Sequence, residues 1–312
     1  MSQPQTQTRP SRSLAGKVAI VTGAGTAGEG IGNGRAIAIL LAEDGASVVC
    51  VDRDAALAAR TAEMIGDEGR GRALAVAGDV TREADCAAAV EAAVRAYGRV
   101  DILVNNVGVL GPRGTATETD PAAWARGLEV NVTSMALMAK HAIPAMLRNG
   151  GGEDGDDADD EGRGQGEGQG HAQRRPPPPP SEPRGSIVNV GSVAGLRGGT
   201  PSLLYPTSKG AVVNMTRAMA AHHGPQGVRV NCVCPGMLYT PMMHSPDAGA
   251  GPSMSEATRE ARRHRSLLGT EGNAWDAAAA VRFLAGGEAR WITGTVLTVD
   301  AGATCSTAIT ME

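Results

Sequence analysis

The sequence predicts a doubly wound α/β fold, in which a parallel seven-stranded sheet lies between two layers of helices. Short runs rich in β-branched residues alternate with longer Ala-rich stretches along most of the 312 residues. The strand-like runs are apolar throughout, as expected for parallel strands covered on both faces. A glycine-rich turn follows the first run, which is typical of a sheet that binds its ligand beyond the carboxyl ends of its strands.

The first half of the chain is expected to contain four strands and the helices that cross between them. Its β-branched runs predict strands at 17–22, 46–52, 73–77 and 100–105. The intervening periodic stretches predict helices at 35–43, 55–68 and 83–97. Connections between parallel strands need such a crossover and are right-handed, so each helix is expected to cover a face of the sheet.

The second half continues the same alternation, beginning with a long helix at 124–146. The remaining apolar runs predict strands at 187–190, 228–234 and 295–299. Helices are expected between and before them, at 205–222 and 273–284. The complete set gives seven strands in a three-layer α/β/α arrangement.

Two segments do not have the composition of a folded domain. Residues 1–13 are polar and lack the apolar stretch of a secretory signal, so we expect a disordered N-terminal tail. Residues 150–183 contain acidic, Gly/Gln and poly-Pro runs that cannot bury enough apolar area to offset their ordering entropy. Because strand-like sequence resumes directly afterwards, we predict a single domain, 14–312, interrupted by a disordered insertion.

Composition narrows the function. The net charge of −4 shows no excess of basic residues, which argues against nucleic-acid binding. No apolar run approaches the ~20 residues of a membrane span. The five cysteines are odd in number and scattered through apolar segments, which favours reduced thiols in a cytoplasmic protein. No histidine cluster completes a metal site, so no metal is expected.

The glycine-rich turn predicts a dinucleotide site. Glycines let the backbone approach a pyrophosphate and leave amides free at a helix N-terminus. The candidate contacts in this turn are Gly23, Gly25, Gly30, Ile31 and Gly32. An acidic residue, Asp52, ends the second strand about 20 residues later, where its carboxylate is placed to accept both ribose hydroxyls and to repel a 2′-phosphate. This favours NAD over NADP, although the adjacent Arg53 leaves NADP open.

Polar or small residues also end the other strands, where a ligand would lie. Asp79 and Val80 are expected near the adenine, and Asn106 and Gly108 beside the cofactor. Further along the chain, Ser192 and the pair Pro235 and Gly236 occupy the same kind of position. Turn formation is the alternative explanation, since Gly, Asp and Asn all favour turns.

Tyr205 and Lys209 are candidates for proton transfer. They are four residues apart and would share one face of a helix. A nearby ammonium favours the phenolate, and lowering a tyrosine pKa of ~10 by about three units needs roughly 4 kcal/mol. The pair would then suit proton exchange with a hydroxyl. The alternative is a Tyr and a Lys exposed on a helix surface.

Together these residues resemble the short-chain dehydrogenase/reductase family, over about residues 14–303 apart from the insertion. The pattern includes Asn106-Val107-Gly108, Ser192, Tyr205-x-x-x-Lys209, Pro235-Gly236 and Trp291-Ile292-Thr293-Gly294. The resemblance implies a Rossmann fold with Tyr205 as catalytic acid/base. It also implies that Lys209 lowers the phenol pKa and holds the nicotinamide ribose.

The resemblance implies three further roles. Ser192 would steady the substrate oxygen, Asn131 would support a water chain that feeds protons to Lys209, and Thr240 would contact the nicotinamide carboxamide. The glycine loop is longer than the family's usual form, so the glycines that hold the pyrophosphate stay open. This length resembles the enoyl-reductase branch, which spaces its Tyr and Lys more widely.

The expected function is hydride transfer between NAD(P) and a small-molecule ketone or secondary alcohol. Methionines in 237–268, the expected substrate lid, favour an apolar or cyclic substrate, with core filling as the alternative explanation. The resemblance also implies a homodimer or homotetramer through the helices at 124–146 and 205–222. The alternatives are a non-redox enzyme on this fold, such as an isomerase, dehydratase or cyclase, and a nucleotide-sensing binding protein.

Overall fold

Seven parallel strands form a single sheet in the computed structural model, which describes residues 9–28, 30–69, 71–150, 183–244 and 254–306. Their order across the sheet is β3-β2-β1-β4-β5-β6-β7. The strands are β1 Val18–Thr22, β2 Ser47–Asp52, β3 Arg72–Ala77, β4 Ile102–Asn105, β5 Gly185–Val190, β6 Val228–Pro235 and β7 Val296–Val299. The order reverses between β1 and β4, so the predicted doubly wound sheet is confirmed, and a ligand site is expected at that reversal.

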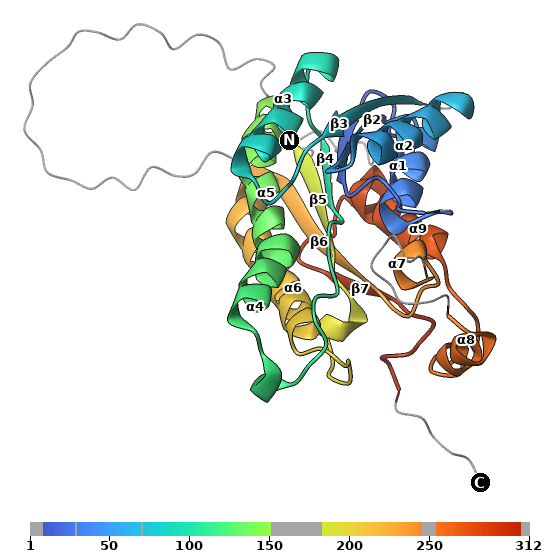
Figure 1. Ribbon diagram of the computed structural model, residues 1–312. Coiled ribbons are helices and arrows are strands. Elements are labelled where there is room, and N and C mark those ends of the chain that lie inside the picture. Colours follow the sequence, from blue (N-terminus) through green and yellow to red (C-terminus); the bar gives the residue numbers. More distant parts are fainter. Residues whose placement is uncertain (1–8, 29, 70, 151–182, 245–253, 307–312) are drawn as a thin grey trace, which may run out of the picture.

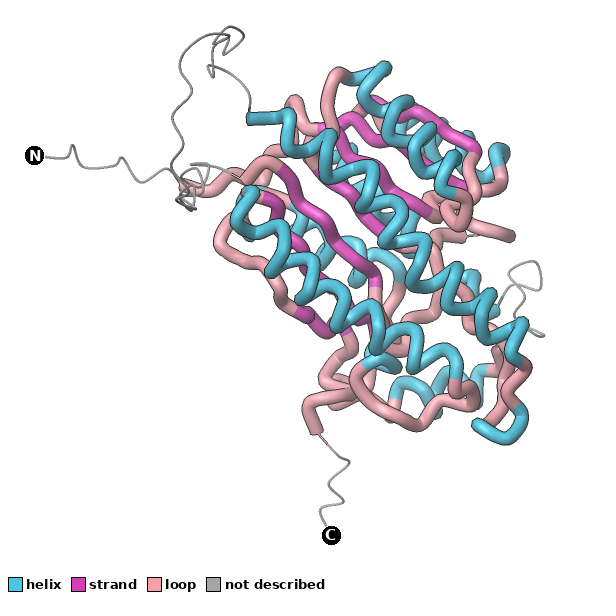
Figure 2. The backbone as a smooth tube through the Cα atoms, turned by 90° about the vertical axis from the view of Figure 1, so that its left-hand side faces the viewer, coloured by secondary structure: helices cyan, strands magenta, loops and turns pink. Residues whose placement is uncertain are grey.

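Helices cover both faces of the sheet (Figures 1 and 2). One layer contains α1 Asn33–Glu43, α2 Ala55–Asp67 and α9 Ala274–Ala285. The other contains α3 Glu83–Tyr97, α5 Ser134–Leu147 and α6 Leu204–His223. The three-layer arrangement therefore follows the prediction, with most element ends within one or two residues of those expected.

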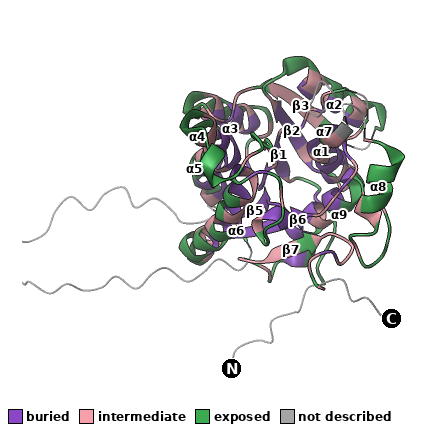
Figure 3. Cartoon of the chain, turned by 60° about the horizontal axis from the view of Figure 1, so that its bottom comes forward, coloured by how far each residue is buried: buried purple, intermediate pink, exposed green. Residues whose placement is uncertain are grey.

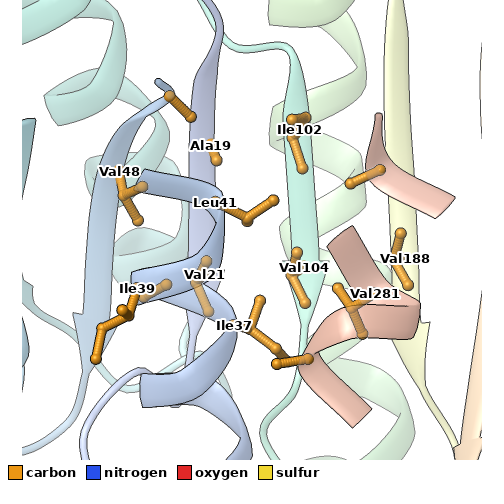
Figure 4. Close-up of a cluster of buried hydrophobic side chains, with 14 of the residues drawn as sticks. Ala19, Val21, Ile37, Ile39, Leu41, Val48, Ile102, Val104, Val188 and Val281 are labelled. Atoms are coloured by element: carbon orange, nitrogen blue, oxygen red, sulfur yellow. The ribbon is translucent and has the colours of Figure 1, made fainter. Parts of the chain in front are cut away.

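Alternate residues of each strand face the two layers, because side chains in a strand alternate in direction. Val21 of β1 and Val104 of β4 pack with Ile37 of α1 and Val281 of α9 (Figure 4). Their neighbour Ile20 faces the opposite cluster, with α3 and α5. The two clusters bury the middle of the sheet, which fixes the positions of the strand ends that carry the site.

The long helix predicted at 124–146 is interrupted, which is a correction. The segment begins earlier, because Pro121 and the capping side chain of Asp120 start α4 (Pro121–Leu128). A π-helical turn, Glu129–Thr133, then separates α4 from α5. Hydrophobic periodicity cannot distinguish one π turn from an α-helix, but such turns often mark functional sites. Asn131 lies in this turn.

The segment after β6 forms two short helices, α7 (Pro241–His244) and α8 (Glu256–Arg263). Helix α8 lies at the edge of the molecule with an exposed surface (Figure 3). An ion-pair network joins it to Glu271, which precedes α9. This segment corresponds to the predicted substrate lid.

Residues 1–8 and 151–182 of the predicted disordered segments lie outside the described residues, so those predictions stay predictions. At the described end of the N-terminal segment, Arg12 Nε lies 3.0 Å from Asp44 Oδ1. Strands on both sides of the predicted insertion join one sheet, since β5 pairs with β4. No helix in the described ranges combines the length and apolar character needed to cross a membrane.

Candidate active site

A cavity of ≈ 480 Å³ lies at the carboxyl ends of the strands, where the sheet order reverses. It extends from the end of β2, through the turn before α1, to the ends of β5 and β6 and the start of α6. Most residues predicted from the sequence line it: Gly23, Gly25, Gly32, Asp52, Arg53, Asp79, Val80, Asn106, Gly108, Ser192, Tyr205, Lys209, Pro235, Gly236 and Thr240. The topology therefore brings together residues that are up to 217 positions apart, from Gly23 to Thr240.

Three predicted residues do not line this cavity. Gly30 is exposed, and its carbonyl accepts a hydrogen bond of 2.9 Å from Arg35 Nη1. Ile31 packs against the core beside α1. Asn131 is fully buried behind the cavity wall. The lengthened loop thus places Gly30 and Ile31 away from the cavity. The glycines that line the cavity wall lie at the two ends of this loop.

Several glycines at the turn between β1 and α1 have no room for a side chain. Gly23 has a φ of +62°, a backbone conformation that favours glycine. A Cβ on Gly34 would lie 1.9 Å from the Gly23 carbonyl oxygen, and one on Gly25 would lie 2.6 Å from Leu57 Cβ. Strand and helix therefore approach closely, which explains why glycine is required here.

The start of α1 suits a pyrophosphate. Gly32 caps the helix without a side-chain hydrogen bond, and no acidic residue occupies the first turn. The Asn33 side chain, on the cavity wall, contains a buried Oδ1 with no hydrogen-bond partner. Free amides and the helix dipole favour an anion at such an end. The residues present therefore fit the dinucleotide that the sequence predicts.

Asp52 lies at the opposite end of the cavity from the catalytic candidates. Its Oδ2 accepts a hydrogen bond from Gly25 N at 2.9 Å, and its Oδ1 accepts one from Asp54 N at 3.1 Å. Each carboxylate oxygen keeps further acceptor capacity. The carboxylate is thus held in place and still able to accept hydroxyl groups. Asp79 lies nearby, and its hydrogen bond from Thr81 N lowers its pKa.

Ser192 and Tyr205 lie at the end of the cavity formed by β5 and α6. The Ser192 hydroxyl is nearly buried and accepts a hydrogen bond of 3.1 Å from Ala194 N. Burial raises the pKa of the Tyr205 phenol, and the side-chain hydrogen bond with Ser192 acts in the opposite direction. The raised pKa keeps the phenol in its neutral form at neutral pH, which is the form that donates a proton.

Lys209 lies beside Tyr205, on the same face of α6 as predicted. Its Nζ is 6.0 Å from the centre of the Tyr205 ring and donates a hydrogen bond of 2.9 Å to the Val190 carbonyl. Burial lowers the pKa of Lys209 to about 8. The pKa of the phenol is raised rather than lowered, because burial outweighs the hydrogen bond with Ser192.

Asn131 holds the loop after β4 against α6. Its Oδ1 accepts from Val109 N at 2.8 Å, and its Nδ2 donates to Val109 O and to Ser208 Oγ, each at 2.9 Å. A Cβ on Gly108 would lie 3.2 Å from Lys209 Nζ and 3.5 Å from Asn131 Oδ1. A side chain at 108 would therefore press against the amine of Lys209.

The lowered pKa of Lys209 gives a testable stability effect. Between about pH 8 and the ordinary 10.5, the unfolded chain holds a proton that the folded protein has released. The free energy of unfolding therefore rises with pH across this window. Lys209→Met removes this dependence on pH. The free energy of unfolding of the variant, taken relative to that of wild type, should therefore fall by about 3 kcal/mol between about pH 7 and pH 10.5. Urea unfolding measures it.

Lys140→Met, which removes an exposed lysine of α5, is the control for this experiment. A relative change of the same size in that control would contradict the assignment to the buried amine.

Several cavity residues were not predicted from the sequence. They include Thr26, Asn33 and Gly34 in the turn, and two arginines, Arg126 and Arg262. The close approach of β1 and α1 identifies Gly34, but the sequence leaves several glycines equivalent. The arginines come from α4 and α8, and nothing in the helix pattern shows that they face the cavity.

The lid contributes an apolar part of the wall through Leu238, Met242 and Met243. Two other aromatic residues, Tyr239 of the lid and Trp124 of α4, lie away from this wall. The Tyr239 ring packs against Arg259, whose Cζ is 4.2 Å from the ring centre. Trp124 lines a separate small cavity of ≈ 40 Å³. Tyr205 is therefore the aromatic residue on the main cavity wall among the described residues.

Comparisons with known proteins agree with this geometry. The family model described as short chain dehydrogenase matches residues 17–153. A second model, described as enoyl-(acyl carrier protein) reductase, matches residues 175–304. A solved structure of a short-chain dehydrogenase/reductase from Burkholderia xenovorans is similar with a TM-score of 0.77 and 36% identity, covering 95% of this chain and 99% of that one.

Two curated relatives match over nearly their whole length. One, 2-(S)-hydroxypropyl-CoM dehydrogenase 3 of Xanthobacter autotrophicus, is 35% identical and covers 94% of this chain and 99% of its own. The other, cis-4-hydroxycyclohexanecarboxylate dehydrogenase of Sinomonas cyclohexanicum, is 35% identical, and the match covers 93% of this chain and 98% of that relative. The chain belongs to the short-chain dehydrogenase/reductase family and is an NAD(P)-dependent oxidoreductase acting on CH–OH and C=O groups.

Proposed function

We propose that this enzyme uses NAD to interconvert an apolar, cyclic secondary alcohol and its ketone, with Tyr205 as the acid/base. The observation that carries this proposal is the single cavity that holds Asp52 at one end and Ser192, Tyr205 and Lys209 at the other. A dinucleotide stretched between these ends supplies the hydride. The apolar lid residues and the ring alcohol in the name of one relative support the substrate class.

The protein groups would manage the proton and the oxygen. In the direction of ketone reduction, the neutral Tyr205 phenol donates its proton to the carbonyl oxygen. The Ser192 hydroxyl, which already bonds Tyr205, donates to the same oxygen and stabilises its developing negative charge. Lys209 is placed to hold the nicotinamide ribose, and Asn131 to keep the loop at Val109 in position. Thr240, nearly buried on the wall, would contact the carboxamide.

A panel of cyclic and acyclic ketones tests this function, with NADH or NADPH, followed by absorbance of the reduced nicotinamide. We expect turnover of apolar ring ketones with NADH above NADPH. A preference for charged, sugar-like carbonyls would remove the substrate class. No turnover of any carbonyl or alcohol, with nucleotide bound, would remove the redox function.

Asp52→Ala is expected to reduce the preference for NAD. The carboxylate should accept ribose hydroxyls and repel a 2′-phosphate, and a hydrogen bond to a charged group contributes about 1.5–3 kcal/mol. The ratio of kcat/KM for NAD over NADP should therefore fall roughly 10- to 100-fold. Asp67→Ala, which removes an exposed carboxylate at the end of α2, is the matched control and should leave the ratio unchanged. An unchanged ratio in the Asp52 variant would show that Asp52 does not select the cofactor.

The proposed assembly is a homodimer or homotetramer in the cytoplasm. Helices α4, α5 and α6 lie on one side of the molecule, and small residues on them permit close packing of helices (Figure 1). The five cysteines are free, which supports a reducing compartment. Sedimentation of the intact chain measures the assembly, and a monomer would contradict this proposal.

A further inference from the structure

Helix α8 places one arginine without an ion-pair partner on the wall of the active-site cavity. Two of its arginines are engaged with carboxylates: Arg259 with Glu271, and Arg263 with Glu256. Arg262 lies between them in the sequence and lines the cavity. Within the described ranges, no carboxylate lies within 4.0 Å of its guanidinium, and Glu271 acts on it only from a longer range.

Among the described residues, one hydrogen bond holds the Arg262 guanidinium in place. Its Nη2 donates a hydrogen bond of 3.1 Å to the Leu238 carbonyl. The side chain is partly buried, and this burial lowers its pKa. A partly buried cation without a counter-ion is costly unless a ligand supplies the negative charge. A guanidinium has five donors in a rigid fork, so most of them stay available for a planar anion.

The surroundings of Arg262 define what the ligand should look like. Leu238 follows β6 by three residues and is nearly buried on the cavity wall. Met242 and Met243 line the same cavity from α7. Among its described residues, the lid thus offers the cavity an apolar surface with a single cation. A ligand complementary to it has an apolar body and one anionic group.

We propose that Arg262 binds an anionic group of the substrate, a carboxylate or a sulfonate, and so makes the enzyme selective for apolar ketones and alcohols that carry one. The inference rests on the proposed function, because it assigns a ligand to the substrate part of the same cavity. Arg262 acts here as a specificity residue and has no part in the proton transfer by Tyr205.

The pyrophosphate of the dinucleotide is the competing anion. Its expected site is the start of α1, after β1, whereas Arg262 is bound to the segment after β6. Two strands, β4 and β5, separate β1 from β6 in the sheet, which favours the substrate. The lid does return toward the glycine turn, because a Cβ on Gly30 would lie 3.5 Å from Pro241 Cγ. The experiment therefore has to separate the two anions.

Two ketones of similar shape test the proposal: 4-oxocyclohexanecarboxylate and the neutral 4-methylcyclohexanone, each with NADH. Arg262→Gln should lower kcat/KM for the acid roughly 10- to 100-fold, the range for a hydrogen bond to a charged group. The neutral ketone should change by no more than about twofold. Arg262→Lys keeps the charge but loses the fork, so its loss for the acid should be smaller. It also provides a second variant if the first does not fold.

Arg265→Gln is the matched control, since Arg265 is exposed just beyond α8 and does not line the cavity. It should leave both ketones unchanged. If Arg262→Gln weakens NADH binding and lowers kcat/KM equally for both ketones, the arginine binds the pyrophosphate and the proposal is overturned. It is also overturned if the acid and the neutral ketone respond equally with NADH binding intact.

An unreactive anion separates failure of this inference from failure of the proposed function. Calorimetry with cyclohexanecarboxylate measures binding to the NAD complex whether or not a ketone is reduced. If wild type binds cyclohexanecarboxylate and Arg262→Gln does not, the result supports the anion site. If in addition neither ketone is reduced, only the proposed function fails. Reduction of both ketones, with cyclohexanecarboxylate binding unaffected by the substitution, removes the inference and leaves the proposed function standing.

Discussion

Tyr205→Phe is expected to lower kcat for ketone reduction roughly 10²- to 10⁴-fold, the usual contribution of general acid–base catalysis. The substitution removes the phenol that we propose as the proton donor and keeps the aromatic ring at the start of α6. Dinucleotide binding should persist, because the turn before α1 and Asp52 are untouched. Absorbance of NADH measures the turnover, and quenching of intrinsic fluorescence measures the affinity.

Tyr97→Phe is the matched control for this experiment. Tyr97 is partly buried at the end of α3, where Arg72 lies 5.2 Å from its ring, and it does not line the cavity. The control should keep the activity of the wild type. If Tyr205→Phe retains more than about a tenth of that activity, the phenol is not the proton donor, since even the lower limit of such catalysis is 10².

Gly34→Ala is expected to damage both stability and activity. The new Cβ would lie 1.9 Å from the Gly23 carbonyl oxygen and 2.7 Å from Asn106 Nδ2, so the backbone of β1 and α1 would have to move apart. Overpacking of this kind typically costs about 1–3 kcal/mol, and a backbone contact places this site at the upper end. Displacement of the turn by about 1 Å should lower kcat/KM for NADH roughly 100-fold. Urea unfolding and steady-state kinetics measure the two effects.

Gly66→Ala controls for the change from glycine to alanine in a helix. Gly66 lies in α2, and its Cβ would meet nothing within 4 Å. That variant should gain about 0.5–1 kcal/mol through helix propensity and keep its activity. Wild-type unfolding and kinetics in Gly34→Ala would show that the close approach of strand and helix is not needed.

The sheet was predictable because each strand is a continuous apolar run bounded by turn residues. The predicted strand that ends at Asp52 has the same end as β2. The predicted strand that ends two residues before Ser192 has the same end as β5. Parallel strands place their carboxyl ends at one edge, so Asp52 and Ser192 were expected around one ligand before any contact was visible, whereas Tyr205 was assigned to that site by the family resemblance. The presence of Asp52 and Ser192 on one cavity wall follows from that rule.

Other features depend on packing that periodicity does not record. The π turn at Asn131 has an apolar pattern close to that of an α-helix. The two hydrogen bonds between Asn131 and Val109 join residues 22 positions apart, so a local pattern does not reveal them. The glycine turn contains several glycines, and only the 1.9 Å approach to Gly23 identifies Gly34 as the crowded one. The orientation of Arg262 depends on a contact with Leu238 across the lid.

The direction of the Tyr205 pKa also depends on tertiary structure. The spacing of Tyr205 and Lys209 predicts attraction between a phenolate and an ammonium. In the folded protein, burial of both groups favours their neutral forms, which raises the pKa of Tyr205 and lowers that of Lys209 to about 8. The spacing of two residues fixes their proximity, whereas their desolvation depends on elements distant in the sequence.

A crystal structure of the enzyme with NAD tests the central claim most directly. The account predicts the adenosine ribose at Asp52, the pyrophosphate at the start of α1, and the nicotinamide beside the Tyr205 hydroxyl with Lys209 bonded to its ribose. A nicotinamide bound away from Tyr205, with Lys209 still bonded only to Val190, would contradict the proposed role of this site.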